Sequence, residues 1–322
     1  MNYSEQKAWK EIQRTLPENY RFTDSFSPTE EWWTWKGHKI HLDCFRNPRA
    51  EVKVIMLHGV GTNGRQMSMI TGGPLAKNGY ETIAIDMPTY GLTEVAKNTT
   101  VIYDDWIELG NDYINYELSR DSRPIFLYGL SAGGMETYDV ACRNGKVKGI
   151  IGMTFLDQQN ADVRNTTTRN WFMSRIAVPM LGVLNKTGFG KVKIKMSIAS
   201  KMWALCNNDT AMKAFMKDKT SAGNSCTVAF LDSYMHHRLL CSPENFNVCP
   251  ILLTQPEKDR WTPLRLSKPF LDKIRKVDVK IAMLPDGGHY PVEPAALIKM
   301  KQEIIAFIEL SLIHISEPHE TS

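Results

Sequence analysis

The chain has 322 residues, of which 43% are hydrophobic and 23% charged, and its formal net charge is +4. A chain of this length can bury a full hydrophobic core and fits one large domain or two small ones. Its charge is nearly balanced, and no arginine-rich run or interleaving of aromatic with basic residues indicates a nucleic-acid partner.

Residues 1–7 have neither the basic start nor the apolar stretch of a signal peptide, and no apolar run approaches the roughly 20 residues of a membrane helix. We therefore expect a cytoplasmic protein without a transmembrane segment. The cysteines form no C-x-x-C pair and no zinc-type cluster with histidines, so no metal site is predicted. We expect free thiols that fill apolar space, with disulfides as the alternative in a secreted form. The six are Cys44, Cys142, Cys206, Cys226, Cys241 and Cys249.

The first predicted elements are a helix and a hairpin. Residues 4–16 show helical spacing of apolar side chains, with Ser4 as N-cap and Pro17 ending the helix. Residues 31–45 alternate in the manner of two strands around Lys36 and Gly37, which predicts a β-hairpin.

A predicted strand at residues 52–57 leads into the glycine-rich loop H-G-V-G-T-N-G-R-Q-M, residues 58–67. The glycine spacing matches neither a P-loop nor a dinucleotide-binding fingerprint. It suits an oxyanion loop better, in which the backbone N–H groups of Val60 and Ala132 would stabilise a developing alkoxide.

Residues 80–86 form the next predicted strand, and residues 101–118 have the apolar spacing of a helix. Asp86 precedes a turn rather than a catalytic motif, so we expect it to have a structural role there.

Residues 124–134, P-I-F-L-Y-G-L-S-A-G-G, contain a buried-type strand, a serine between glycines and the start of a helix. This is the context that a nucleophile elbow requires, and glycines at 129 and 133 permit the close backbone approach of so sharp a turn. Ser131 is therefore the predicted nucleophile. The alternative is an ordinary glycine-serine turn that closes a strand.

With a further strand predicted at residues 147–156, strands and helices alternate at βαβ spacing. This pattern predicts an α/β fold with a mainly parallel central sheet and helices on both faces. The alternation stops at residues 157–248, which we interpret as an inserted helical cap, so that residues 1–156 and 249–310 form one core domain.

The cap is rich in methionine and basic residues. It holds seven of the sixteen methionines and carries twelve Lys/Arg against six Asp/Glu, a net charge of +6. The apolar residues fit either ordinary packing or an acyl-chain pocket. The lysines fit either a solvated face or attraction to an anionic substrate or membrane surface, so transient membrane contact stays open.

Two loops that follow predicted strands complete the candidate site. Asp259 follows the strand at 248–254, and His289 follows the strand at 279–284. Asp157, after an earlier strand, is the rival acid. His289 is the predicted base by elimination, because every other histidine falls in the hairpin, the glycine-rich loop, the cap or the tail. Those are His38, His41, His58, His236, His237, His314 and His319.

The last predicted helix spans residues 294–310. Residues 311–322 fit no preceding pattern and resemble translated adapter sequence, so we expect a non-native or disordered tail.

The order Ser131, Asp259, His289, each residue just past a predicted strand, is that of the α/β-hydrolases. The motifs H-G-V-G-T-N-G-R, I-D-M-P-T-Y-G-L-T, G-L-S-A-G-G, E-K-D-R-W-T-P and G-G-H-Y-P carry this resemblance across residues 32–310. The chain most resembles the branch that holds monoacylglycerol lipases, lysophospholipases and serine-aminopeptidase-like hydrolases. Many members of that branch have Met after the nucleophile, where this chain has Ala132.

The resemblance implies a cofactor-free serine hydrolase in which Ser131 attacks, His289 acts as base, Asp259 orients it, and Val60 and Ala132 bind the oxyanion. A carboxylic ester with an apolar acyl group is the expected small-molecule substrate. Peptide, lactone or thioester cleavage, acyl transfer, and a non-catalytic ligand-binding role are the alternatives. The oligomeric state is left open.

Overall fold

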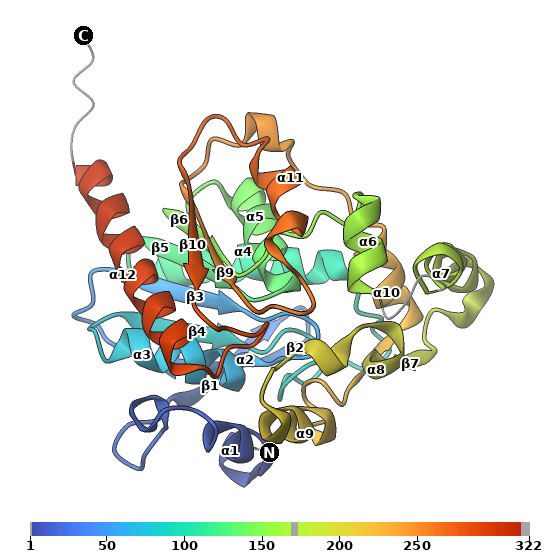
Figure 1. The fold of residues 1–322 in the computed structure, drawn as a ribbon, viewed down its shortest axis with the longest axis horizontal. Coiled ribbons are helices and arrows are strands. Elements are labelled where there is room, and N and C mark those ends of the chain that lie inside the picture. Colours follow the sequence, from blue (N-terminus) through green and yellow to red (C-terminus); the bar gives the residue numbers. More distant parts are fainter. Residues whose placement is uncertain (1, 169–172, 317–322) are drawn as a thin grey trace.

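A central eight-stranded sheet organises the part of the chain that this computed structural model describes, residues 2–168 and 173–316 (Figure 1). The strand order is β1-β2-β4-β3-β5-β6-β9-β10. The first two strands form the predicted hairpin, β2 pairs antiparallel with β4, and all later neighbours are parallel. The strands are β1 (Thr29–Trp35), β2 (His38–Phe45), β3 (Lys53–Leu57), β4 (Glu81–Ile85), β5 (Ile125–Gly129), β6 (Gly149–Gly152), β9 (Ile251–Pro256) and β10 (Val279–Leu284).

The inner strands are buried on both faces. Every residue of β3, β4, β5, β6 and β9 is buried, which explains their near-continuous apolar sequences. The edge strand β10 instead alternates between exposed and buried positions over its second half.

Helices cover both faces of the sheet. α4 and α5 pack together on one face, and α3 and α12 pack together on the other (Figure 1). The core helices are α2 (Gly64–Met67), α3 (Gly73–Ala76), α4 (Tyr103–Arg120), α5 (Ala132–Asn144), α11 (Lys268–Leu271) and α12 (Pro294–Ser316). Short 3-10 or π-helical turns lie at Glu18–Tyr20, Ser68–Gly72, Pro243–Asn245 and Leu264–Leu266.

Two helices differ from the sequence expectation. The N-terminal helix is broken into a turn at Tyr3–Glu5 and α1 (Ala8–Gln13), whose N-cap is Lys7 rather than Ser4. α12 continues past Leu310 to Ser316, so residues 311–316 are helical rather than disordered. The rest of the expected tail, residues 317–322, lies outside the described residues.

The N-terminal segment ties the core to the cap. α1 packs against α9 (Asp209–Lys217) of the cap. The Tyr3 hydroxyl donates to the buried Asp86 carboxylate at 2.9 Å, which also accepts from the backbone N–H groups of Gly64 and Leu92. Asp86 therefore holds its turn and the N-terminus together, the kind of structural role that the sequence suggested.

The segment that the sequence suggested as a cap, here described at residues 157–168 and 173–248, lies to one side of the sheet in Figure 1 and is mainly helical. Against expectation it also contains a small antiparallel sheet of β7 (Lys193–Lys195) and β8 (Ser225–Thr227). The other cap elements are α6 (Ala161–Thr167), α7 (Val178–Leu184), α8 (Met196–Ala199), α9 and α10 (Val228–Met235), with turns at Met173–Ala177, Asn185–Phe189 and Met202–Ala204.

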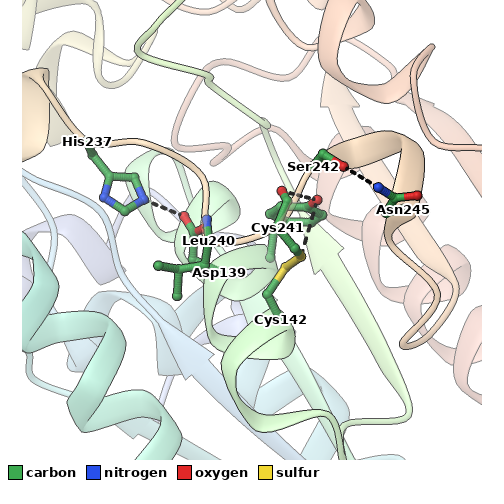
Figure 2. The surroundings of a disulfide bond; sticks show 8 residues. Asp139, Cys142, His237, Leu240, Cys241, Ser242 and Asn245 are labelled. Carbon is green, nitrogen blue, oxygen red and sulfur yellow. Dashed lines mark hydrogen bonds and ion pairs between the residues drawn. A yellow bond between two sulfur atoms is a disulfide. The ribbon is translucent and has the colours of Figure 1, made fainter.

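A disulfide corrects the expectation of free thiols. Cys142, near the end of α5, is bonded to Cys241 in the segment that leaves the cap (Figure 2). The two cysteines are 99 residues apart in sequence, and their Cα atoms lie 6.1 Å apart. Tertiary folding alone brings them together, so the sequence spacing gave no signal. The other four cysteines are free and buried, as expected.

Within residues 2–168 and 173–316, no helix combines the length and apolar character needed to cross a membrane.

Candidate active site

Ser131 lies at the turn between β5 and α5, where the predicted elbow is formed. Its backbone has φ 57° and ψ −122°, a conformation that L-residues rarely adopt. A Cβ on Gly129 would collide with the Gly133 carbonyl oxygen, and one on Gly133 with that of Leu57. The two glycines therefore allow β5, α5 and the end of β3 to meet, and the strained turn sets Ser131 at the tip.

Asp259 and His289 form a buried pair at the carboxyl ends of β9 and β10. His289 Nδ1 lies 2.9 Å from Asp259 Oδ2, and both side chains are almost fully buried. Asp259 Oδ1 accepts from the backbone N–H groups of Trp261 and Thr262, at 2.8 and 2.7 Å. Burial alone would raise the pKa of Asp259, but the adjacent His289 and the Thr262 hydrogen bonds outweigh it and hold the pKa below its usual value.

Asp157, the rival acid, is placed elsewhere. Its Oδ1 accepts from the backbone N–H of Gln159 at 2.9 Å, in a turn that follows β6. The structure thus pairs His289 with Asp259 and leaves Asp157 in a local turn.

The loop after β3 lies against the elbow. A Cβ on Gly59 would stand 2.6 Å from the Leu130 carbonyl oxygen and 2.9 Å from Ser131 Cβ. Val60, the next residue, lines the same cavity as Ser131. Ala132 is the first residue of α5, so its N–H has no acceptor one turn back in the helix. Both predicted oxyanion donors therefore lie around the Ser131 position.

A cavity of about 200 Å³ opens at Ser131. The core contributes Val60, Trp261 and Thr262 to its wall, and the cap contributes most of the rest. The cap side chains are largely apolar, and three of them are methionines: Met180, Met196 and Met235. The acyl-pocket interpretation of the cap thus has a matching cavity.

His289 Nε2 is the ring nitrogen that remains for chemistry. Within the described residues this buried atom has no hydrogen-bond partner. The Trp261 ring packs 4.9 Å from the His289 ring, and both Trp261 and Thr262 line the cavity with Ser131. Nδ1 is taken by Asp259, so Nε2 is free to act as a proton acceptor.

Sequence reasoning missed Thr262 and the part played by His58. The Thr262 hydroxyl donates to Asp259 Oδ2 at 2.8 Å and lies 3.0 Å from His289 Nδ1. A threonine three residues after an aspartate is a signal for such a local turn. Burial lowers the pKa of His58, and its Nε2 accepts from the backbone N–H of Met87 at 2.9 Å, which anchors the glycine-rich loop.

No group of three or more His, Cys, Asp or Glu side chains in the described ranges is arranged to hold a metal ion.

The mainly parallel sheet, the strand-to-helix serine turn and the family comparison define an α/β-hydrolase. The family described as "Serine aminopeptidase, S33" matches residues 48–293, and the chain belongs to it. The expected branch of the superfamily is thereby confirmed. No curated protein sequence matches the chain significantly.

Solved structures show the same fold. A soluble variant of monoglyceride lipase from Saccharomyces cerevisiae, in complex with a substrate analogue, is 15% identical with a TM-score of 0.72, covering 89% of this chain and 97% of its own. Monoacylglycerol lipase from Paleococcus ferrophilus is 18% identical with a TM-score of 0.63, covering 84% and 99%. Mouse α/β-hydrolase domain-containing protein 10 is 17% identical with a TM-score of 0.61, covering 88% and 99%. The family supports a hydrolase, and these solved structures show that the chain shares their fold.

Proposed function

We propose that this protein is a cofactor-free serine hydrolase that cleaves carboxylic esters through an acyl-enzyme. The observation that carries the proposal is the strained Ser131 at an apolar cavity, close to the buried Asp259–His289 pair. Trp261 packs on the His289 ring, Thr262 donates to Asp259, and both Trp261 and Thr262 line the same cavity as Ser131.

In this proposal His289 Nε2 takes the Ser131 proton as the hydroxyl oxygen attacks the ester carbonyl. Asp259 fixes the imidazole tautomer and stabilises its cation, and Thr262 holds the Asp259 carboxylate in place. The N–H groups of Val60 and Ala132 stabilise the tetrahedral oxyanion, and each such donor typically contributes about 3–4 kcal/mol to the transition state. The protonated His289 then gives its proton to the leaving alcohol.

Deacylation repeats these steps with water. His289 Nε2 accepts a proton from water as the water oxygen attacks the acyl carbonyl, and the Ser131 oxygen leaves with that proton. The acid product is released and the free enzyme is restored.

The cap cavity supports a preference for an apolar acyl group. Its wall is largely aliphatic, and burial of each methylene contributes about 0.8 kcal/mol. We therefore propose a small-molecule ester with a medium-length acyl chain, of the kind found in simple carboxylic esters or lysolipid-like compounds.

Hydrolysis of p-nitrophenyl esters from acetate to dodecanoate tests this function. Wild type should hydrolyse them, and Ser131→Ala should lose the activity. Ser200→Ala is the matched control, because Ser200 lines the same cavity but donates its hydroxyl to the Met196 carbonyl oxygen. A folded wild type without activity on any ester would contradict the proposal and direct attention to peptides, lactones, thioesters or a binding role.

The cytoplasmic location expected from the sequence belongs to this proposal as well. Disulfides are rare in the cytosol, so the state of the Cys142–Cys241 pair is informative. Trapping of thiols in intact cells should find the pair reduced if the location is cytoplasmic; a fully oxidised pair would count against it.

A further inference from the structure

A second, much smaller chamber adjoins the apolar cavity. Its volume is about 10 Å³, which is room for a single water-sized group. Leu156 and Tyr234 line both spaces, so these two side chains form the boundary between them. The other polar residues of the chamber wall are Tyr103, Asp157, Gln158 and His237.

Two residues that line this chamber carry buried polar atoms with unused hydrogen-bonding capacity. Within the described residues, the Tyr103 hydroxyl and Gln158 Oε1 have no hydrogen-bond partner, although both side chains are at least nine-tenths buried. Gln158 Nε2 is already committed, because it donates to the Tyr234 hydroxyl at 3.1 Å. Buried polar groups without partners are costly, and a ligand that satisfies them gains correspondingly.

Glu136 is a further buried polar group in the first turns of α5. It follows Met135, which lines the chamber, and both of its carboxyl oxygens are buried without a partner among the described residues. Burial raises the pKa of Glu136 well above its usual value, and Asp139 raises it further.

The chamber wall on the cap side is firmly held. His237 Nε2 lies 2.8 Å from Asp139 Oδ2, the Leu240 N–H donates to Asp139 Oδ1, and the Cys142–Cys241 bond fastens the same segment to α5 (Figure 2). Burial alone would lower the pKa of His237, but Asp104 and Asp139 raise it to about 9. The imidazolium on this wall disfavours an ammonium ligand. Asp157, which also lines the chamber, and Asp139, which contacts His237, disfavour a carboxylate.

We propose that this chamber is a subsite for an uncharged hydroxyl group carried by the acyl chain of the substrate. The hydroxyl donates to Gln158 Oε1 and accepts from Tyr103, while the apolar part of the chain lies in the larger cavity. The inference rests on the proposed function, and it narrows the substrate class to esters of hydroxylated acids.

Two matched series of p-nitrophenyl esters test the subsite: plain alkanoates and ω-hydroxyalkanoates from butanoate to dodecanoate. At one or a few adjacent chain lengths, wild type should favour the hydroxylated ester by about tenfold in kcat/KM, the effect of one well-formed hydrogen bond. Tyr103→Phe should reduce this preference severalfold. Tyr116→Phe, on the exposed side of the same helix, should leave the preference unchanged.

Ester binding to the inactive variant Ser131→Ala, measured as a shift in Tm, tests the subsite independently of catalysis. The same esters should raise the Tm of Ser131→Ala, and more so for the hydroxylated member at the favoured length. Hydrolysis of plain esters without preference for a hydroxyl at any length would overturn the subsite alone. A preference for the hydroxylated ester that is unchanged in Tyr103→Phe would also overturn the subsite. Absence of hydrolysis in both series would overturn the proposed function. In that case, equal Tm shifts of Ser131→Ala with hydroxylated and plain esters would also overturn the subsite.

Discussion

At the residue scale, one carboxylate oxygen of Asp259 serves two partners. Oδ2 accepts the Thr262 hydroxyl and lies 2.9 Å from His289 Nδ1, while Oδ1 accepts two backbone N–H groups. These bonds favour the ionised carboxylate and fix its direction. Asp259 therefore fits the role of orienting His289 better than Asp157, which lies in a local turn.

Replacement of each aspartate by asparagine checks this assignment. Asp259→Asn should lower kcat by roughly 10³–10⁴-fold, because the amide favours the wrong imidazole tautomer. Asp157→Asn is the matched control and should stay within about twofold of wild type. Steady-state ester hydrolysis at neutral pH gives both values; near-wild-type activity of Asp259→Asn would refute the assignment.

A second residue-scale prediction concerns the stability of the N-terminal contact. His41 lies 2.9 Å from both Glu30 Oε1 and Asp86 Oδ2. Burial would lower the pKa of His41, but the two carboxylates raise it from 6.5 to about 9. Since the folded-state pKa lies above the unfolded value, this contribution to stability is complete below about pH 6.5 and is lost as the pH rises through 9.

His41→Gln should therefore lower the free energy of unfolding by about 2–3 kcal/mol at pH 6 and by clearly less at pH 9.5. Urea unfolding at the two pH values measures the difference. His38→Gln serves as the control, because burial lowers the pKa of His38, so any pH dependence of its contribution has the opposite sign. If His41→Gln lowers the free energy of unfolding equally at both pH values, the ion pairs of His41 do not contribute to stability.

At the scale of elements, the disulfide joins the helix that follows Ser131 to the segment that leaves the cap. It closes a loop of 99 residues, and bonds of this kind typically stabilise a protein by about 2–4 kcal/mol. The bond also fixes the wall of the small chamber.

The variant with both Cys142→Ser and Cys241→Ser should lose about 2–4 kcal/mol of unfolding free energy relative to oxidised wild type. Urea unfolding with and without a thiol reductant supplies the control, because reductant should destabilise wild type and leave the double variant unchanged. Equal stability of oxidised and reduced wild type would contradict a stabilising role.

The cap elements set the length of the cavity. Met180 on α7 lines it and is half-exposed, so a bulkier side chain can be accommodated there without overpacking the core. Met180→Trp should shorten the acyl pocket by about two methylenes, which corresponds to a loss of roughly tenfold in kcat/KM on dodecanoate. Activity on butanoate should change little.

Met216→Trp is the matched control for this element. Met216 is a partly exposed methionine on α9 of the cap that does not line the cavity. Its replacement should leave the chain-length profile unchanged. If Met180→Trp has the same chain-length profile of kcat/KM as wild type, the acyl chain does not lie beside Met180.

At the scale of the whole molecule, much of the fold could be predicted because local patterns agree with it. The apolar runs of β3, β4 and β5 are buried strands, and the glycines around Ser131 stand where backbones meet. Asp259 and His289 each follow a strand of one parallel sheet, so their carboxyl-end positions bring the two side chains together.

The parts that sequence reasoning missed depend on contacts between distant segments. Cys142 and Cys241 are 99 residues apart in sequence, and α1 packs against α9, about 200 residues further along the chain. The small chamber arises in the same way, since Tyr103, Gln158 and His237 come from three separate parts of the chain.

The central claim is that Ser131 is an activated nucleophile, and covalent labelling tests it most directly. A fluorophosphonate should react with wild type at one site per chain, and peptide mass spectrometry should place the adduct on Ser131. Ser131→Ala should not be labelled, Ser200→Ala should be labelled as wild type is, and His289→Asn should react far more slowly. A folded wild type that stays unlabelled, or one whose adduct lies on another residue, would contradict the account.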